Sequence, residues 1–268
     1  SSGVIVTGGT NGLVVEGANA KVITPVGNLA LSGQTGKYIQ LIENSNNIDA
    51  TAVSFDGNEG SELSLNQLFA TEDKIDHKID NSALGFVSVK LNQDFVTINS
   101  GSIQRAIDAA SSGWIVNINS GTYTSPVNIN KGIKLYGLNS EISPVNGSRS
   151  SEAILSTTSG TMLNVTTTEP VEIKGLEFAN SGGAYDYSLT GGVGTTIDLQ
   201  KNYFNNSIGV YLPNAVSTTI ADNLCTFSSG ADEGFALFGN YNGTTGTLVN
   251  IHDNKFLNGQ MTGFNLSN

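Results

Sequence analysis

Short runs in which apolar and polar residues alternate occur throughout this chain of 268 residues. An alternation with a period of two is typical of a β-strand that buries one face and exposes the other. Glycine, asparagine and serine separate the runs, and these residues favour turns. The pattern therefore predicts many short strands, and the first of them are expected at residues 4–6, 12–17, 28–33, 38–42 and 50–57.

One ten-residue phrase recurs four times in the second half of the chain. The copies are VEIKGLEFAN (171–180), IDLQKNYFNN (197–206), TTIADNLCTF (218–227) and VNIHDNKFLN (249–258). Aligned, they give three columns: Ile173, Leu199, Ile220 and Ile251; Leu176, Asn202, Asn223 and Asn254; Phe178, Phe204, Cys225 and Phe256.

Repetition at this distance with strand periodicity predicts a solenoid of stacked rungs. The positions of the middle column are 26, 21 and 31 residues apart. When parallel strands stack in register, apolar columns form a continuous core and the asparagines form an amide ladder. We therefore predict an all-β, right-handed parallel β-helix, in which Cys225 is a small buried hydrophobic residue.

Two segments have helical spacing instead. In 61–81, Ser64 and Gln67 fit a capping box, and apolar residues from Leu65 to Ile79 form one stripe. In 102–113, Ser102 is a natural N-cap. The opposite face of the first helix carries His77 among acidic residues; a metal site is one interpretation, and a solvated acidic face is the favoured one. Those acidic residues are Asp73, Asp76 and Asp80.

These elements divide the chain into three expected parts. Residues 1–60 are predicted to be the terminal rungs of one β-helical segment, and 61–81 a connecting helix. Residues 82–268 are predicted to form a second, capped right-handed β-helix that is open at its C-terminus.

Composition excludes several classes of partner. The formal net charge is −11, and only 12 residues are Lys or Arg. Nucleic-acid binding requires clustered basic residues, so nucleic acid is not an expected partner. No apolar run approaches the roughly 20 residues that a membrane helix needs, so membrane insertion is not expected.

The first part of the second segment resembles a known family. SIQRAIDAASSG (102–113), followed by VNINSGTYTSPVNINKGIKLYGLN (116–139), resembles the N-terminal cap and first rungs of pectin lyase-like right-handed β-helices. The longer stretch 70–111 resembles a junction found in very large bacterial surface and adhesin-like proteins. The resemblance implies an extracellular or bacterial cell-surface location, with neighbouring β-helical units as partners, in cis or head-to-tail.

Because that family includes polysaccharide lyases and hydrolases, acidic residues on adjacent rungs are of interest. Asp222 and Asp253 occupy corresponding positions, and His252 precedes Asp253. Neighbouring residues of a strand point to opposite faces, so His252 is not expected to act with Asp253. The sequence favours a solvated or ladder-capping role, and we predict no catalytic, cofactor-binding or metal residues. Weak Ca²⁺ binding by Asp222 with Asp253, or by Asp232 with Glu233, is the one cofactor considered.

The sequence thus favours a non-catalytic structural or adhesive segment of an extracellular bacterial surface protein or filament, whose β-helical units stack end to end. The alternative is a carbohydrate-active β-helix enzyme, a lyase or hydrolase, or a glycan-binding module. Surface glycans are possible partners, and Tyr185 and Tyr187, in the glycine-rich stretch 179–194, are the predicted glycan contacts.

Overall fold

A computed structural model describes residues 3–22, 26–158, 160–179, 187–212, 216–226, 233–238, 248–257 and 262–267. The fold is a right-handed parallel β-helix, as predicted, and the chain divides into two compact units, Ser1–Ala110 and Ser111–Asn268. Among the described residues, the strands pair in parallel apart from one antiparallel pair of two-residue strands, β6 (Ser54–Phe55) with β7 (Asn58–Glu59).

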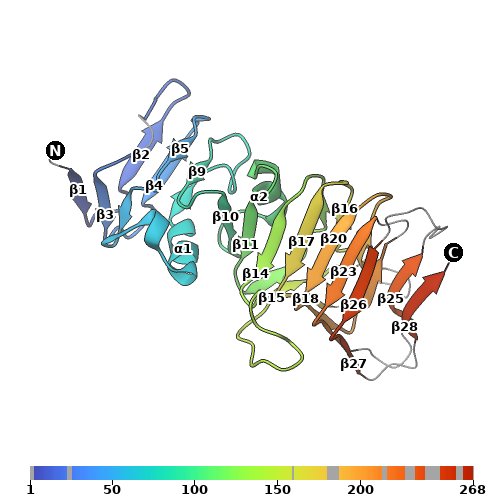
Figure 1. Cartoon of the computed structure of the whole chain (residues 1–268). Coiled ribbons are helices and arrows are strands. Elements are labelled where there is room, and N and C mark those ends of the chain that lie inside the picture. The colour runs from blue at the N-terminus through green and yellow to red at the C-terminus, as the bar shows by residue number, and fades with distance from the viewer. Residues whose placement is uncertain are drawn as a thin grey trace. The chain divides into compact units, whose positions relative to one another are not determined.

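The second unit is built from three parallel sheets, and each complete coil contributes one strand to each sheet (Figure 1). The first sheet contains β11 (Ile115–Ile118), β14 (Lys134–Gly137), β17 (Pro170–Lys174), β20 (Thr196–Gln200), β23 (Ser217–Ala221) and β26 (Leu248–His252). The second contains β12 (Gly121–Tyr123), β15 (Ala153–Leu155), β18 (Leu176–Ala179), β21 (Tyr203–Asn205), β24 (Leu224–Thr226) and β27 (Lys255–Leu257). The third contains β13 (Val127–Ile129), β16 (Leu163–Val165), β19 (Tyr187–Gly191), β22 (Ile208–Tyr211), β25 (Glu233–Phe238) and β28 (Thr262–Ser267).

The register of these sheets confirms the predicted apolar columns. Ile173, Leu199, Ile220 and Ile251 are successive partners in the first sheet. Phe178, Phe204, Cys225 and Phe256 are successive partners in the second. The rings of Phe178 and Phe204 stack with centroids 4.9 Å apart, and Cys225 is fully buried, as expected. Burial also raises the pKa of the Cys225 thiol.

The predicted asparagine ladder is present as well. The Asn223 side-chain oxygen accepts a hydrogen bond from the Asn202 amide at 2.9 Å, and the Asn254 oxygen accepts one from the Asn223 amide at 3.0 Å. The Asn223 Nδ2 group donates to the Leu199 and Ala221 carbonyls, each at 3.0 Å. Asn202 and Asn223 are completely buried, so the ladder satisfies backbone groups that water does not reach.

The first unit contains shorter parallel sheets. One sheet has the order β1 (Val4–Thr7), β3 (Leu29–Ser32), β6, β7. A second consists of β2 (Leu13–Glu16), β4 (Ile39–Ile42) and β8 (Ile75–Asp76), and β5 (Ile48–Asp49) pairs with β9 (Val87–Ser88). The unit also contains β10 (Gln93–Val96), a 3-10 turn (Gly60–Glu62), and the helices α1 (Leu65–Glu72) and α2 (Ile103–Ala109).

Helix α1 differs in length and place from the connecting helix expected over 61–81. The Gln67 side chain accepts a hydrogen bond from the Ser64 amide at 3.0 Å, as a capping box requires, but the helix ends at Glu72. The strands that follow it, β8 and β9, pair with β4 and β5, which precede it. The helix is therefore an excursion within a coil, and the first unit continues beyond it to Ala110.

Candidate functional site

A column of left-handed residues follows the strands of the first sheet in the second unit. Gly175, Lys201, Asp222 and Asp253 have φ values of 70°, 53°, 54° and 56°. Each stands directly before a residue of the middle repeat column, so one left-handed residue turns the chain from the first sheet to the second. Asp is among the few residues other than Gly that adopt this conformation routinely. The acids therefore occupy equivalent turn positions on neighbouring rungs, as the alignment predicted.

A loop from the first complete rung lies across this column. The loop, residues 139–152, is called the strap below. Arg149 of the strap donates to the Lys201 carbonyl at 2.8 Å, and Glu141 lies 3.7 Å from the Lys201 ammonium. A partly buried ion pair at 2.6 Å between Arg149 and Glu152 holds the base of the strap. The strap thus fastens one rung to turns that follow it by more than fifty residues in sequence.

The strap also engages Asp222. Ser143 Oγ donates a hydrogen bond to Asp222 Oδ1 at 2.5 Å. The same oxygen accepts hydrogen bonds from the amides of Val145 and Asn146, at 3.1 and 3.3 Å, which orient the hydroxyl proton toward the carboxylate. Asp222 is therefore a fastening point for the strap. No local signal in the sequence pairs Ser143 with a residue 79 positions away, so the sequence did not identify Ser143.

His252 and Asp253 do contact each other, contrary to the expectation that they point to opposite faces. His252 Nδ1 lies 2.8 Å from Asp253 Oδ2. The strand rule fails because β26 ends at His252 and Asp253 takes the left-handed conformation, which turns its side chain back toward the ring. The side chains of His252 and Asp253 are 50% and 79% exposed, so their contact is a surface one.

The three residues singled out by the repeat meet in one open pocket of about 670 Å³. Asp222, His252 and Asp253 line it together with residues of the strap and of the adjoining turns. Those residues are Ser143, Val145, Asn146, Gln200, Lys201, Ala221, Asn254 and Lys255. Within the described part of the chain, the pocket does not bring three metal-ligating atoms close together.

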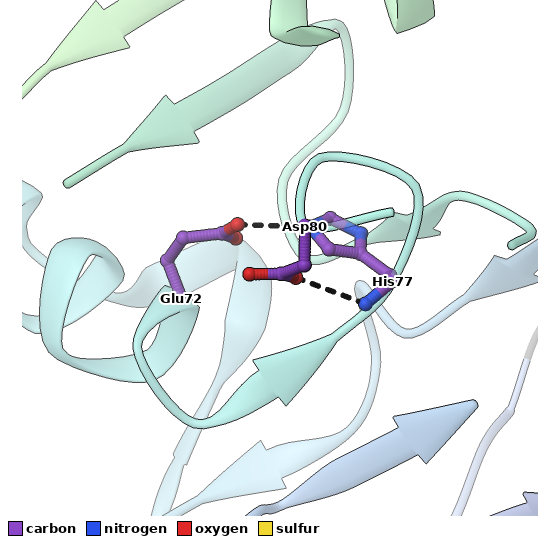
Figure 2. Close-up of side chains that lie close together, drawn as sticks. All are labelled: Glu72, His77 and Asp80. Atoms are coloured by element: carbon purple, nitrogen blue, oxygen red, sulfur yellow. Dashed lines mark hydrogen bonds and ion pairs between the residues drawn. The ribbon is translucent and has the colours of Figure 1, made fainter. Parts of the chain in front are cut away.

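The one group of potential metal ligands among the described residues lies in the first unit and consists of Glu72, His77 and Asp80 (Figure 2). The favoured expectation of a solvated acidic face is wrong here, because the side chains of His77 and Glu72 are only 1% and 3% exposed. Helix α1 ends at Glu72 and the chain returns to strand, which takes His77 into the interior against Phe86, with ring centroids 5.3 Å apart.

The hydrogen bonds of His77 identify its tautomer. The Val87 amide donates to Nδ1 at 3.0 Å, so Nδ1 carries no proton. The proton of the neutral ring is then on Nε2, which lies 2.8 Å from Glu72 Oε1 and donates to it. A metal ion at Nε2 would need the lone pair that this proton occupies. We therefore interpret the cluster as a buried hydrogen-bond network, in which Asp80 accepts from the His77 amide at 3.0 Å.

Burial makes Glu72 the electrostatically unusual member of this network. Burial raises the pKa of the Glu72 carboxyl, and the favourable contact with His77 offsets this effect only in part. The nearby carboxylates of Asp80 and Asp73 raise the Glu72 pKa further. The sequence did not identify Glu72 as a member of this cluster, because in the helix expected over 61–81 its spacing placed it with the apolar stripe, on the face opposite His77.

The predicted glycan contacts fall partly outside the structure's description. Tyr185 lies outside the described residues. Of the pair considered for Ca²⁺, Asp232 and the side chain of Glu233 lie outside them as well. Tyr187 is partly exposed and stacks on Tyr211 of the next rung, with ring centroids 5.1 Å apart and an interplanar angle of 25°. Sequence analysis did not identify Tyr211, whose position one rung later supplies the second ring.

No helix among the described residues is long and apolar enough to cross a membrane. Comparisons of this chain with protein-family models, with curated proteins and with solved structures give no match.

Proposed function

We propose that this chain is a non-catalytic structural segment of an extracellular bacterial surface protein, with a β-helix of the pectin lyase-like kind. Its β-helical units stack on neighbouring units, in cis or head-to-tail, and carry adhesive contacts. The observation that supports this proposal is the content of the repeated columns. The positions that recur from rung to rung are Ile or Leu, Asn, and Phe or Cys, which pack and hydrogen-bond the rungs.

The neighbourhood of the acids supports the same proposal. Asp222 binds the strap through Ser143, and Arg149 holds the Lys201 turn. These contacts fasten the strap to later rungs of the same solenoid. Stability in a solenoid arises from each rung and its interface with the next, so added fastenings along one side stiffen the stack.

An activity assay tests the non-catalytic part of the proposal. The chain is incubated with uronic and neutral polysaccharides, and released reducing ends and unsaturated products are measured. We expect no turnover above that of the Asp222→Asn and Asp253→Asn variants, which keep a residue that tolerates the left-handed turn. Turnover by the unmodified chain that disappears in either variant would contradict the proposal.

Two further measurements test location and stacking. Antibodies raised against the chain should label intact source cells, and labelling that requires lysis would contradict a surface location. Sedimentation velocity over increasing concentration should show head-to-tail oligomers. When two consecutive units are joined in one chain, they should form a single rod that unfolds cooperatively. A monomer at every concentration, together with independent unfolding of joined units, would argue against stacking.

A glycan-binding module or carbohydrate-active enzyme is the second candidate. It is supported by the Tyr187–Tyr211 stack, because a partly exposed aromatic pair can provide an apolar platform for sugar rings. Tyr187→Ala should then abolish retention on immobilised glycans, whereas Tyr203→Ala, on the second sheet, should not. Equal retention of both variants would remove the support for this candidate.

A further inference from the structure

Two asparagines of the described chain stand directly before a glycine, in very different surroundings. The pairs are Asn11–Gly12 in the first unit and Asn146–Gly147 in the strap. In such a pair the backbone nitrogen of glycine can attack the asparagine side-chain amide, because glycine has no side chain to obstruct the approach and leaves the backbone free to adjust. Two further pairs, at 242–243 and 258–259, lie outside the described residues.

The Asn11 side chain is held at both ends of its amide. Its Nδ2 group donates to Gln40 Oε1 at 3.0 Å, and its Oδ1 atom accepts from the Lys37 amide at 3.1 Å. Asn11 and Gly12 are both only partly exposed. Rotation of the Asn11 side chain toward the Gly12 nitrogen must therefore first break both hydrogen bonds.

Asn146 has no such restraint. Asn146 and Gly147 are exposed, and among the described residues the side chain of Asn146 makes no hydrogen bond. Only the backbone of the pair is engaged: the Asn146 amide donates to Ser143 Oγ at 3.3 Å, and the Gly147 amide donates to the Ser143 carbonyl at 2.9 Å. The Asn146 side chain can therefore turn toward the Gly147 nitrogen at little cost.

We propose that Asn146 is a site of spontaneous deamidation, with water as the co-reactant. The Gly147 nitrogen attacks Cγ of Asn146 and forms a C–N bond. The Cγ–Nδ2 bond breaks, and Nδ2 leaves as ammonia with the proton of the Gly147 amide. Water then opens the cyclic imide at one of its two carbonyls, without any oxidation or reduction. One product has an aspartate at position 146, and the other an isoaspartate, whose main chain is longer by one methylene group.

Both products weaken the attachment of the strap. Asn146 lines the same pocket as Asp222 and Asp253, whose charges two lysines of the lining balance, so the new carboxylate adds an unbalanced negative charge there. In the isoaspartate product the longer main chain also disrupts the turn that holds the Ser143 hydroxyl toward Asp222. Deamidation is thus an irreversible step that releases the strap from later rungs, whatever the role of the whole chain.

Peptide mapping by mass spectrometry tests the site on the folded chain, incubated in mildly alkaline buffer. We expect the peptide with Asn146 to gain about one dalton, and to contain isoaspartate, at least about tenfold faster than the peptide with Asn11, where two hydrogen bonds must first break. In the denatured chain the two peptides should react at similar rates. Deamidation of Asn11 in the folded chain as fast as that of Asn146 would overturn the proposal.

Trypsin cleavage after Arg149, the one lysine or arginine of the strap, tests the release. Arg149 is held by the Lys201 carbonyl and by Glu152, so the fresh chain should be cleaved slowly there. The incubated chain should be cleaved at least about tenfold faster, because the hydrogen bond of Ser143 to a charged acceptor is lost.

The Asn146→Gln variant is the matched control. Its longer side chain would have to close a larger, more slowly formed ring, so the variant should remain resistant to trypsin after the same incubation. Circular dichroism checks that it keeps the fold. The proposed release is overturned if fresh and incubated chains are cleaved equally fast, or if incubation sensitises Asn146→Gln as much as the unmodified chain.

Discussion

The two units stabilise similar parallel strands by different means. In the second unit the same kinds of residue return at the same place on each rung, and the ladder of Asn202, Asn223 and Asn254 satisfies one turn after another. In the first unit a helix interrupts a coil, and an individual buried network around His77 satisfies the resulting backbone groups. Repetition therefore stabilises regular rungs, whereas an irregular coil depends on contacts that occur once.

The largest expected effect is on the ladder. Asn223→Ala should lower the free energy of unfolding of the second unit by about 4 kcal/mol, because several buried backbone groups lose their partner at once. The fluorescence of Trp114, the single tryptophan, reports unfolding of this unit. Asn250→Ala, at an exposed position of β26, is the matched control and should cost less than about 0.5 kcal/mol. Equal losses in both variants would show that the ladder is not what stabilises the rungs.

The next effect compares the two histidines. His77→Leu leaves the Glu72 carboxylate and the Val87 amide buried without their partner, so the first unit should lose about 3 kcal/mol. Hydrogen exchange should show faster opening of residues 65–90. His252→Leu, at a half-exposed position of the second unit, should change stability by less than about 0.5 kcal/mol. If the two variants behave alike, the first unit does not depend on the His77 network.

The smallest effect is a pH dependence confined to the first unit. Because burial raises the pKa of Glu72, the folded state binds the proton of the Glu72 carboxyl group more tightly than the unfolded state does. The associated stability is complete below the unfolded carboxyl pKa of about 4.3 and is lost as pH rises through the folded pKa. The slope is at most about 1.4 kcal/mol per pH unit.

Glu72→Gln isolates this contribution. The amide oxygen still accepts from His77 Nε2, but the group no longer titrates, so the fall in first-unit stability with rising pH should be smaller than in the unmodified chain. Glu62→Gln, at an exposed position, should keep the original pH profile. Parallel pH profiles for the unmodified chain and Glu72→Gln, measured by hydrogen exchange of the first unit, would contradict the raised pKa.

Much of the fold of the second unit follows from its sequence. The period-two alternation and the recurrence of Ile, Asn and Phe identified the columns, and the strand register agrees with that alignment. This was possible because a parallel stack brings equivalent positions of successive repeats together. An alignment of the repeats therefore already shows which residues contact each other between rungs. The same reasoning identified Cys225 as buried and the asparagines as a ladder.

The candidate sites were less accessible to sequence analysis, since they depend on contacts that do not repeat. The helical spacing of apolar residues in the sequence continues past Glu72. In the structure, β8 pairs with β4 instead, so the helix ends and His77 is buried. The left-handed turn at Asp253 brings His252 against it, which strand geometry would forbid.

The sequence by itself therefore determined the class of fold and the register of the repeated rungs. Only the tertiary structure decided where single residues act: Ser143 on Asp222 across 79 positions, and Glu72 on His77 in the interior. The physical reason is that the alternation of buried and exposed positions follows directly from the order of residues along each strand. The contacts of the strap with distant turns, and the burial of an ionisable residue such as Glu72, depend instead on how the completed coils pack.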